Sequence, residues 1–232
     1  MCKAYTISAS REQLQSHFDV TVPAQYQARY NARPGQLLPV ITAKNAQVLS
    51  FFYWGLIPSW SKNKSVSEKL INVKAELLLD KVSSNVALGS RRCLVPTNGF
   101  YDWKQISKKG IIPYRFILNQ ENLFGFAGLW EEFETNNGES AHTFTIITTH
   151  ANEAIASTNS RMPVILNPEA EKIWLNPNSK KEELMQILIP SVSSAMGNYA
   201  VSSKVNNPAN DSPDLLLPAP AADQFGNYSL FD

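Results

Sequence analysis

The sequence is poor in cysteine and in charge, and it lacks long hydrophobic runs. Its 232 residues include two cysteines, Cys2 and Cys93, which are too few for a disulfide framework or a four-cysteine zinc site. Charged residues make up 18% of the chain, below the roughly 25% usual in globular domains. No apolar run approaches the ~20 residues of a membrane span, and no secretory signal is visible. We therefore expect a soluble, intracellular, cytoplasmic protein with no membrane partner.

Several motifs of common enzyme classes are also missing. Glycine-rich phosphate loops are absent, which disfavours nucleotide-dependent enzymes, and no serine nucleophile elbow occurs. The three histidines, His17, His142 and His150, do not have the spacing of metal ligands. We expect no metal, no organic cofactor and no nucleotide cofactor.

Hydrophobic residues make up 44% of the chain, enough for a sizeable core. Short β-type runs alternate with turns, and capping signals at Ser10 and Asn167 begin helices. The expected strands are 37–42, 48–53, 93–95, 99–104, 114–118, 123–130, 143–149 and 199–202, and the expected helices cover 10–18, the second half of 70–79, 168–174 and 182–188. We predict an α+β fold: a single compact domain over residues 1–232, around a curved, barrel-like antiparallel sheet with a few peripheral helices. An irregular tail rich in proline and alanine follows from about residue 207.

Charge is unevenly distributed along the chain. Residues 1–120 carry a net charge of +10 and residues 121–232 a net charge of −9, although the total is only +1. Such a chain could present one basic face to an anionic partner. Alternatively, the two halves intermingle in the fold and their charges cancel locally.

Cys2 is the most unusual residue because of its position. Removal of Met1 would leave Cys2 with a free α-amine beside its thiol, and an α-amine has a pKa near 7.7–8.0. The neutral amine attacks an aldehyde to form a Schiff base, and the thiol then closes a five-membered thiazolidine ring. A plain alternative is that Cys2 is a small hydrophobic residue at the start of a strand.

Asn72, Glu76 and Asp102 are polar residues within hydrophobic surroundings. Asp102 lies among aromatic residues in the segment Gly99-Phe-Tyr-Asp-Trp103. An acid in such a place is either paired structurally or has a raised pKa suited to proton transfer.

Tryptophans and cations together could form a groove for single-stranded nucleic acid, in which aromatic rings stack on bases and cations contact phosphates. The candidates are Trp54, Trp60, Trp103, Arg33, Lys74, Arg91, Arg92 and Arg161. The alternative is that the tryptophans belong to the core and the cations are solvated.

An ordered set of motifs decides between these readings. It comprises Cys2, Tyr30-Asn31-x-x-Pro34-Gly35, Trp54-Gly-Leu-Ile-Pro-x-Trp60, Ile71-Asn72-x-x-x-Glu76, Arg92-Cys-Leu-Val-Pro96, Gly99-Phe-Tyr-x-Trp-Lys104, Arg161-Met-Pro-Val-Ile-Leu166 and Val201-Ser-x-x-Val-Asn206. In this order, over roughly residues 2–206, the set resembles the SOS-response-associated peptidase (SRAP) family. The resemblance implies a compact β-rich fold that shields abasic sites in single-stranded DNA through a thiazolidine link to the N-terminal cysteine. Autocatalytic release of Met1 is the peptidase activity implied.

The resemblance also implies roles for individual residues. Cys2 would be the nucleophile, Asn72 would orient the sugar or the Schiff base, and Asp102 and Asn159 would occupy the acid–base positions. The implied DNA-binding residues are Asn31, Pro34, Trp60, Lys74, Glu76, Trp103 and Arg161.

The chain departs from the family pattern at several of these positions. Lys3 and Ala4 stand where Gly-Arg is usual, Lys74 stands for Arg, Asp102 for Glu, and Asn159 for His. Asp102 is one methylene shorter than Glu, and Asn159 cannot shuttle a proton near neutral pH. We therefore expect crosslinking to be retained but slower, with reversal and lyase activity most impaired.

The leading hypothesis is a crosslinking enzyme for abasic sites, with single-stranded DNA as its partner. We expect a monomer that associates with the nucleoid when bound to DNA. One alternative is a divergent paralogue that binds single-stranded or junction DNA without chemistry. A second alternative is a peptidase or amidohydrolase that uses an N-terminal cysteine nucleophile.

Overall fold

Two sheets pack against each other in the computed structural model, which describes residues 2–58, 70–80, 82–120, 123–134, 138 and 140–227. The strands are β1 (Ala4–Ile7), β2 (Arg29–Ala32), β3 (Leu37–Thr42), β4 (Asn45–Trp54), β5 (Asn72–Lys74), β6 (Arg92–Thr97), β7 (Gly99–Gln105), β8 (Ile111–Leu118), β9 (Phe124–Glu134), β10 (Ser140–His150), β11 (Arg161–Pro163), β12 (Ile165–Leu166) and β13 (Met196–Ala200). The α-helices are α1 (Arg11–Phe18), α2 (Val82–Ser90), α3 (Glu153–Ala156), α4 (Pro168–Leu175) and α5 (Lys181–Gln186). This arrangement confirms the predicted α+β fold.

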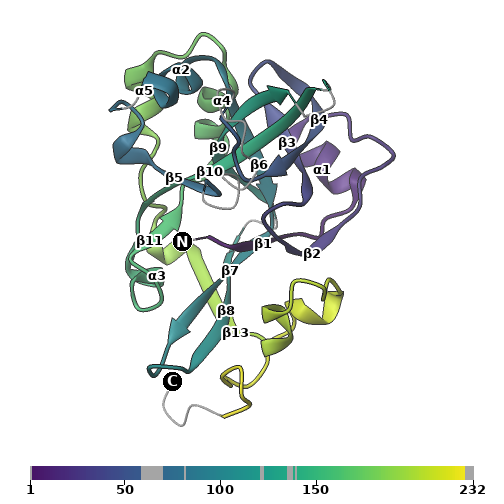
Figure 1. Ribbon diagram of the computed structural model, residues 1–232, viewed down its shortest axis with the longest axis vertical. Coiled ribbons are helices and arrows are strands. Elements are labelled where there is room, and N and C mark those ends of the chain that lie inside the picture. The colour runs from purple at the N-terminus through teal and green to yellow at the C-terminus, as the bar shows by residue number, and fades with distance from the viewer. Residues whose placement is uncertain are drawn as a thin grey trace.

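The larger sheet closes on itself. Strands β10, β4, β3, β6 and β9 pair in that order, and β9 pairs back with β10 to complete a barrel. Strand β10 runs parallel to both β4 and β5, so the barrel is not antiparallel throughout as the sequence predicted. Figure 1 shows α2, α4 and α5 beside the barrel in its upper half.

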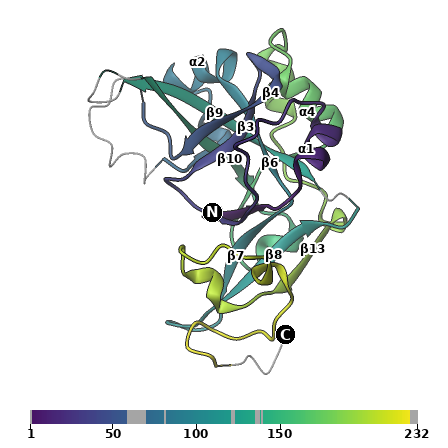
Figure 2. The same cartoon turned by 90° about the vertical axis from the view of Figure 1, so that its right-hand side faces the viewer.

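The smaller sheet has the strand order β13-β8-β7-β1-β2 and lies below the barrel in Figures 1 and 2. Aromatic residues join the two sheets: Tyr5 on β1 makes edge contacts with Trp54 and Phe126, and Phe100 on β7 contacts Phe126 as well. Because β1 takes part in this shared core, the N-terminal end of the chain lies at the junction of the two sheets (Figure 2).

The tail predicted as irregular packs against the smaller sheet. It contains a 3-10 helix at Pro213–Leu216, and Val201 forms an isolated bridge with Pro218. Asp211 accepts hydrogen bonds from the backbone N–H groups of Tyr30 and Asn31 on β2, at 2.6 and 2.9 Å. The tail is therefore an integral part of the fold.

Local signals explain the helices that the sequence predicted. Ser10 and Gln13 form a capping box at the start of α1, and Asn167 caps α4 ahead of Pro168. The segment 70–79 forms strand β5 followed by a 3-10 helix at Ala75–Leu77. The helix expected in the second half of 70–79 is therefore a short 3-10 helix. The elements that were not among those predicted are helices α2 and α3 and strands β1, β2, β5, β11 and β12.

Candidate active site

Strand β1 holds Cys2 against strand β5. The Cys2 side chain is 1% exposed, and the side-chain amide of Asn72 donates a hydrogen bond to the Cys2 carbonyl oxygen at 2.7 Å. Asn72 itself is fixed because β5 pairs in parallel with β10, with Asn72 opposite Ile146. The buried Oδ1 of Asn72 has no hydrogen-bond partner among the described residues. The predicted nucleophile and its predicted orienting residue are therefore in direct contact.

The Cys2 thiol is protonated at neutral pH. Burial, with the nearby charge of Asp102 as a second cause, raises the pKa of the Cys2 thiol from 9.0 to about 12. The Cys2 sulfur lies 3.7 Å from the carbonyl oxygen of Ala4, to which the thiol donates a weak hydrogen bond. Attack by this sulfur therefore requires a group that accepts the thiol proton.

Asp102 provides a buried carboxyl group beside Cys2. It lies on β7, which pairs with β1 so that Tyr101 is opposite Ala4, and its side chain is 5% exposed. Its oxygens accept hydrogen bonds from the Trp103 backbone N–H at 2.8 Å and from the Asn159 amide at 2.9 Å. Burial raises the pKa of Asp102 even though these two hydrogen bonds oppose the shift. Asp102 is thus suited to hold a proton closer to neutral pH than an exposed aspartate.

A cavity of about 520 Å³ opens beside Asp102. Its lining residues are Lys3, Arg33, Asp102, Trp103, Ile111, Asn159, Asn206 and Gln224. The Arg33 guanidinium lies over the Trp103 ring, 5.4 Å from its centroid, and the indole nitrogen donates to Asn206 Oδ1 at 2.6 Å. A cation and a partly exposed indole therefore flank the acid on the side open to solvent.

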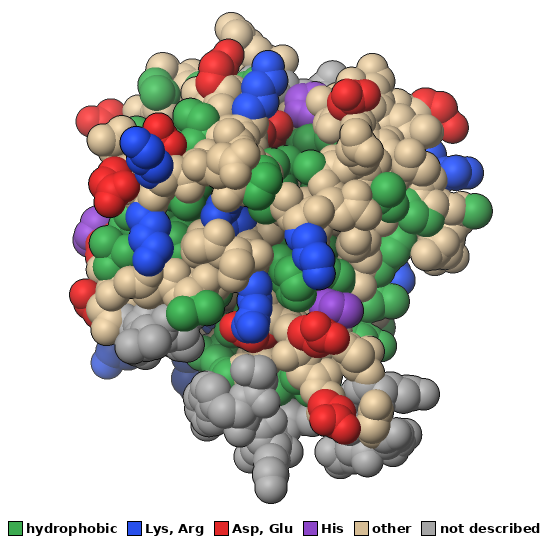
Figure 3. Space-filling model, turned by 90° about the horizontal axis from the view of Figure 1, so that it is seen from above, with side chains coloured by type: hydrophobic (Ala, Val, Ile, Leu, Met, Phe, Trp, Pro, Cys, Tyr) green, Lys and Arg blue, Asp and Glu red, His purple; other side chains and the backbone are tan. Residues whose placement is uncertain are grey.

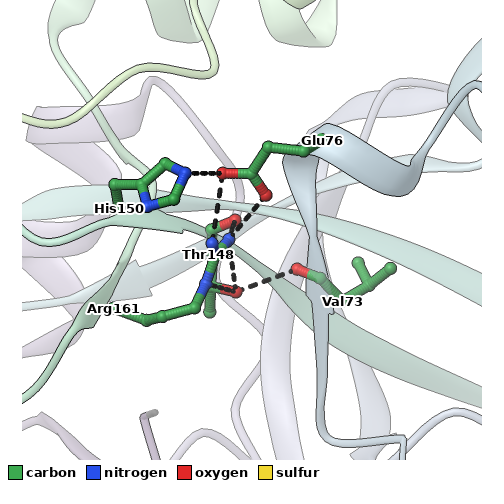
Figure 4. Close-up of polar contacts among 5 residues, drawn as sticks. All are labelled: Val73, Glu76, Thr148, His150 and Arg161. Carbon is green, nitrogen blue, oxygen red and sulfur yellow. Dashed lines mark hydrogen bonds and ion pairs between the residues drawn. The ribbon is translucent and has the colours of Figure 1, made fainter.

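Arg161 is held by protein partners next to this site (Figure 4). Its guanidinium donates to both carboxylate oxygens of Glu76, at 3.1 and 2.8 Å, and to the Thr148 carbonyl oxygen at 2.5 Å. Glu76 also lies 3.3 Å from the exposed ring of His150. Although partial burial acts to raise it, the hydrogen bonds from Arg161 keep the pKa of Glu76 below its ordinary value. The backbone N–H of Arg161 donates to Asn159 Oδ1 at 3.2 Å, so this ion pair is linked to Asp102 through one side chain.

Asn31 is fully buried behind the cavity. Its amide nitrogen donates to the carbonyl oxygens of Val205, Asn207 and Asn210, at 3.0 to 3.3 Å. Its Oδ1 accepts from Arg33 Nε at 2.9 Å. Asn31 thus fixes the position of Arg33, and the expectation that it contacts DNA directly stays a prediction.

The other predicted DNA-binding residues differ in accessibility. Lys74 is exposed, Pro34 is half-buried in the turn before Gly35, and Trp103 is half-buried at the cavity. Trp60 lies outside the described residues, as does Met1. Sequence reasoning did not single out Thr148, whose only sequence signal is its place in the alternating strand 143–149.

On the face of the molecule seen in Figure 3, basic and acidic side chains are interspersed. This face therefore does not carry a continuous basic surface. Although basic residues predominate in the first half of the sequence and acidic residues in the second, side chains of both signs lie next to each other here. Within the described residues, no three histidine, cysteine or acidic side chains gather in a way that could hold a metal ion. None of the described helices is long and apolar enough to cross a membrane.

A sequence model of the family described as SOS response associated peptidase (SRAP) matches residues 1–208. The chain belongs to the SRAP family. It is 40% identical over 221 residues to the abasic site processing protein YoqW of Bacillus subtilis, covering 93% of this chain and 99% of that protein. It is 31% identical to the abasic site processing protein HMCES of Gallus gallus, covering 84% of this chain and 67% of that protein.

A solved structure of a Bacteroides thetaiotaomicron protein has the same fold. The two superpose with a TM-score of 0.85 at 25% sequence identity, covering 94% of this chain and all of the other. The two proteins therefore share this fold although only 25% of their aligned residues are identical.

Proposed function

We propose that this SRAP protein processes abasic sites in single-stranded DNA by forming a covalent link through Cys2. The observation that carries the proposal is the contact between Cys2 and Asn72 beside a buried acid with a raised pKa. The names of its relatives, abasic site processing proteins, support the same substrate.

The reaction begins with hydrolysis of the Met1–Cys2 peptide bond, which consumes one water and frees the α-amine of Cys2. The neutral amine adds to the aldehyde carbon of the ring-opened deoxyribose and gives a carbinolamine. Loss of its hydroxyl group as water leaves a Schiff base. The thiol then adds across the C=N bond: sulfur bonds to carbon, the proton ends on nitrogen, and a thiazolidine closes.

Asp102 is the group best suited to move protons in these steps. In its protonated form it can donate to the departing hydroxyl group, and as a carboxylate it can accept the thiol proton. Asn72 holds the Cys2 backbone through its amide nitrogen, and we propose that its Oδ1, which has no partner among the described residues, accepts a hydrogen bond from the freed amine. The cavity suits a nucleotide, because an indole stacks on bases and cations contact phosphates. Its indole is that of Trp103, and its cations are Arg33 and Lys3.

Intact mass spectrometry tests the proposal, with and without a single-stranded oligonucleotide that contains one abasic site. We expect loss of Met1 and a heat-stable adduct of protein and oligonucleotide. Cys2→Ala should form no heat-stable adduct. Cys2→Ser keeps the α-amine, so it should give an adduct only when borohydride reduces the Schiff base.

Cys93→Ala is the matched control, because it removes the other buried cysteine and should leave the adduct intact. A protein that loses Met1 and binds the oligonucleotide, yet never forms an adduct, would instead be a DNA-binding paralogue without chemistry. A heat-stable adduct formed by Cys2→Ala without borohydride would overturn the role of the Cys2 thiol.

A further inference from the structure

Lys3 lies opposite Asp102 across the pair of strands β1 and β7. The antiparallel register places Ala4 opposite Tyr101, so one more step toward the N-terminus places Lys3 opposite Asp102. Directly opposite residues of an antiparallel pair project from the same face of the sheet. Lys3 is exposed and Asp102 is buried, and both line the cavity of about 520 Å³. The cation therefore belongs to the open side of this cavity and the acid to its buried side.

The charge of Lys3 acts on Asp102 from across the cavity. Burial is the largest influence on the Asp102 carboxyl group and raises its pKa, whereas the positive charge of Lys3 is one of the influences that lower this pKa. Among the ion pairs of the described residues, none joins Lys3 to Asp102. Because the two groups attract each other without direct contact, a third charge that enters the cavity changes the balance between them.

Several other groups that carry charge or titrate lie around Asp102. They are the Cys2 thiol and, once Met1 is removed, the Cys2 α-amine on β1, Arg33 after β2, Tyr114 opposite Asp102 on β8, and Lys104 two residues further along β7. Asn159, which donates to the carboxylate, is neutral, and the ion pair of Glu76 with Arg161 lies beyond it.

The other cations near Asp102 are held by partners of their own. Arg33 donates to Asn31 Oδ1 at 2.9 Å and to the Val205 carbonyl oxygen, and its guanidinium lies over the Trp103 ring. Lys104 Nζ lies 5.8 Å from the centroid of the Tyr114 ring. Within the described part of the chain, Lys3 donates no hydrogen bond and forms no ion pair. Lys3 is therefore a cation of this cavity that an incoming anion can engage.

A DNA strand would bring negative charge into this cavity. Each phosphodiester carries one negative charge, and a lysine ammonium binds phosphate as a point charge. A phosphate that binds Lys3 engages its positive charge and adds a negative charge on the open side of Asp102. A negative charge near a carboxylate favours the protonated form of the acid.

We propose that Lys3 couples binding of the DNA strand to uptake of a proton by Asp102, an inference that rests on the proposed function because the strand is the ligand. In the free protein the ammonium favours the carboxylate. In the complex a phosphate engages the ammonium, and Asp102 takes a proton from solvent. That proton passes to the departing hydroxyl group of the carbinolamine, which leaves as water, and the resulting carboxylate accepts the Cys2 thiol proton. Lys3 is thus a positioning residue, since it acts through the charge of Asp102.

Titration calorimetry of the full-length protein tests this coupling with a single-stranded oligonucleotide that carries a tetrahydrofuran analogue of an abasic site. The analogue has no aldehyde, so binding is measured without chemistry. Binding enthalpies in buffers of different ionisation enthalpy give the number of protons taken up. We expect uptake of part of one proton, largest at about pH 4.5 to 6, because the pKa of Asp102 in the folded protein lies above its ordinary value of 3.8.

Three variants assign this proton to the pair of groups. Lys3→Met should reduce the uptake by about twofold or more and lower the slope of log K against log salt by about 0.7, the value for one phosphate contact on a single strand. Lys3→Arg keeps the charge and should take up as many protons as the parent. Asp102→Asn should still bind the strand but without this uptake. Lys44→Met is the matched control, because Lys44 is an exposed lysine in the β3–β4 turn outside the cavity.

The outcomes separate this coupling from the crosslinking reaction. Strand binding without proton uptake, or with equal uptake by the parent and by either Lys3→Met or Asp102→Asn, would overturn the coupling and leave the proposed function standing. Failure to bind the strand would overturn both. Uptake that depends on Lys3, in a protein that forms no adduct with a true abasic site, would support the coupling and overturn the crosslinking.

Discussion

Asn159 joins Asp102 to the backbone of Arg161: its amide nitrogen donates to the carboxylate at 2.9 Å, and its Oδ1 accepts the Arg161 N–H at 3.2 Å. The two hydrogen bonds fix the orientation of the Asn159 amide. A neutral amide in this position can hold the acid in place, but it cannot take up or release a proton. Of these two side chains, only that of Asp102 can carry a proton.

Replacing Asn159 with histidine should add a second titrating group at the acid. We expect Asn159→His to speed formation or reversal of the adduct several-fold, toward the ~100-fold that a positioned acid–base group commonly contributes. Its rate should also change with pH near 6.5, the ordinary pKa of histidine. Adduct kinetics from pH 5.5 to 8.5 measure both effects. Unchanged rates and an unchanged pH profile would show that the site does not need a second proton carrier.

The length and charge of the acid at position 102 should have separable effects. Asp102→Asn keeps the shape but removes the titrating proton, and should slow adduct formation by about 100-fold. Asp102→Glu extends the carboxyl group by one methylene and should act faster than the parent protein if the reach of Asp102 limits proton transfer. Gel assays of single-turnover rates compare the three proteins. Equal rates for Asp102→Asn and the parent would remove Asp102 from the mechanism.

The ion pair between Glu76 and Arg161 should make stability depend on pH. Because the folded pKa of Glu76 lies below its ordinary value of 4.5, its contribution is present above that value and is lost as the pH falls through the folded pKa. Glu76→Gln should lower the free energy of unfolding at pH 7 by about 1–2 kcal/mol, a figure reduced because the Glu76 side chain is 38% exposed. Urea unfolding between pH 7 and pH 3 should show this difference shrinking in acid.

His150→Ala is the matched control for that measurement. It removes the other partner of Glu76, but the His150 side chain is 77% exposed, so the change should stay within about 0.5 kcal/mol. A loss as large as that of Glu76→Gln would mean that His150, not Arg161, carries the stabilisation.

Asp211 should stabilise the fold more than other acids of the tail. Asp211→Ala leaves two backbone N–H groups of β2 without their acceptor and removes the 3.0 Å ion pair with Arg29. We expect a loss of about 2–3 kcal/mol in the free energy of unfolding. Asp214→Ala, which breaks an exposed 3.5 Å pair with Lys204 and a hydrogen bond from the Ser212 hydroxyl, should cost clearly less than Asp211→Ala. Similar losses for both would show that the contact with β2 contributes nothing.

Helix starts that depend on hydrogen bonds between residues close together in the sequence were predicted correctly. The capping box at Ser10 and the Asn167-Pro168 start of α4 depend on neighbours a few residues away, and both helices form as expected. Strand β1 entered the sequence analysis only through the alternative for Cys2, because the strand is four residues long and every one of them is buried, so it shows no alternation. Parallel pairing of β10 with β4 and β5 could not be anticipated, because no local pattern reports which distant strand lies alongside.

For the site as well, the residues could be predicted from the sequence but their mutual contacts could not. Cys2, Asn72, Asp102 and Asn159 could be named from motifs, but their hydrogen bonds depend on strands far apart in sequence. Glu76 and Arg161 were expected at the DNA, and whether they contact it stays a prediction. Their mutual ion pair, with Thr148 as a further partner, follows from the position of the 3-10 helix at Ala75–Leu77 beside β10.

The packing of the tail onto β2 determines when the site can assemble during synthesis. Asn31 donates to the carbonyl groups of Val205, Asn207 and Asn210, about 175 residues later in the chain, so these contacts form only after residue 210 has left the ribosome. Until then, Arg33 lacks its support and the N-terminal strand has an incomplete neighbour. The neighbours of Cys2, Asn72 and Asp102, are synthesised well before the tail, so the wall of the cavity around Arg33 is completed only after the surroundings of Cys2 have been made.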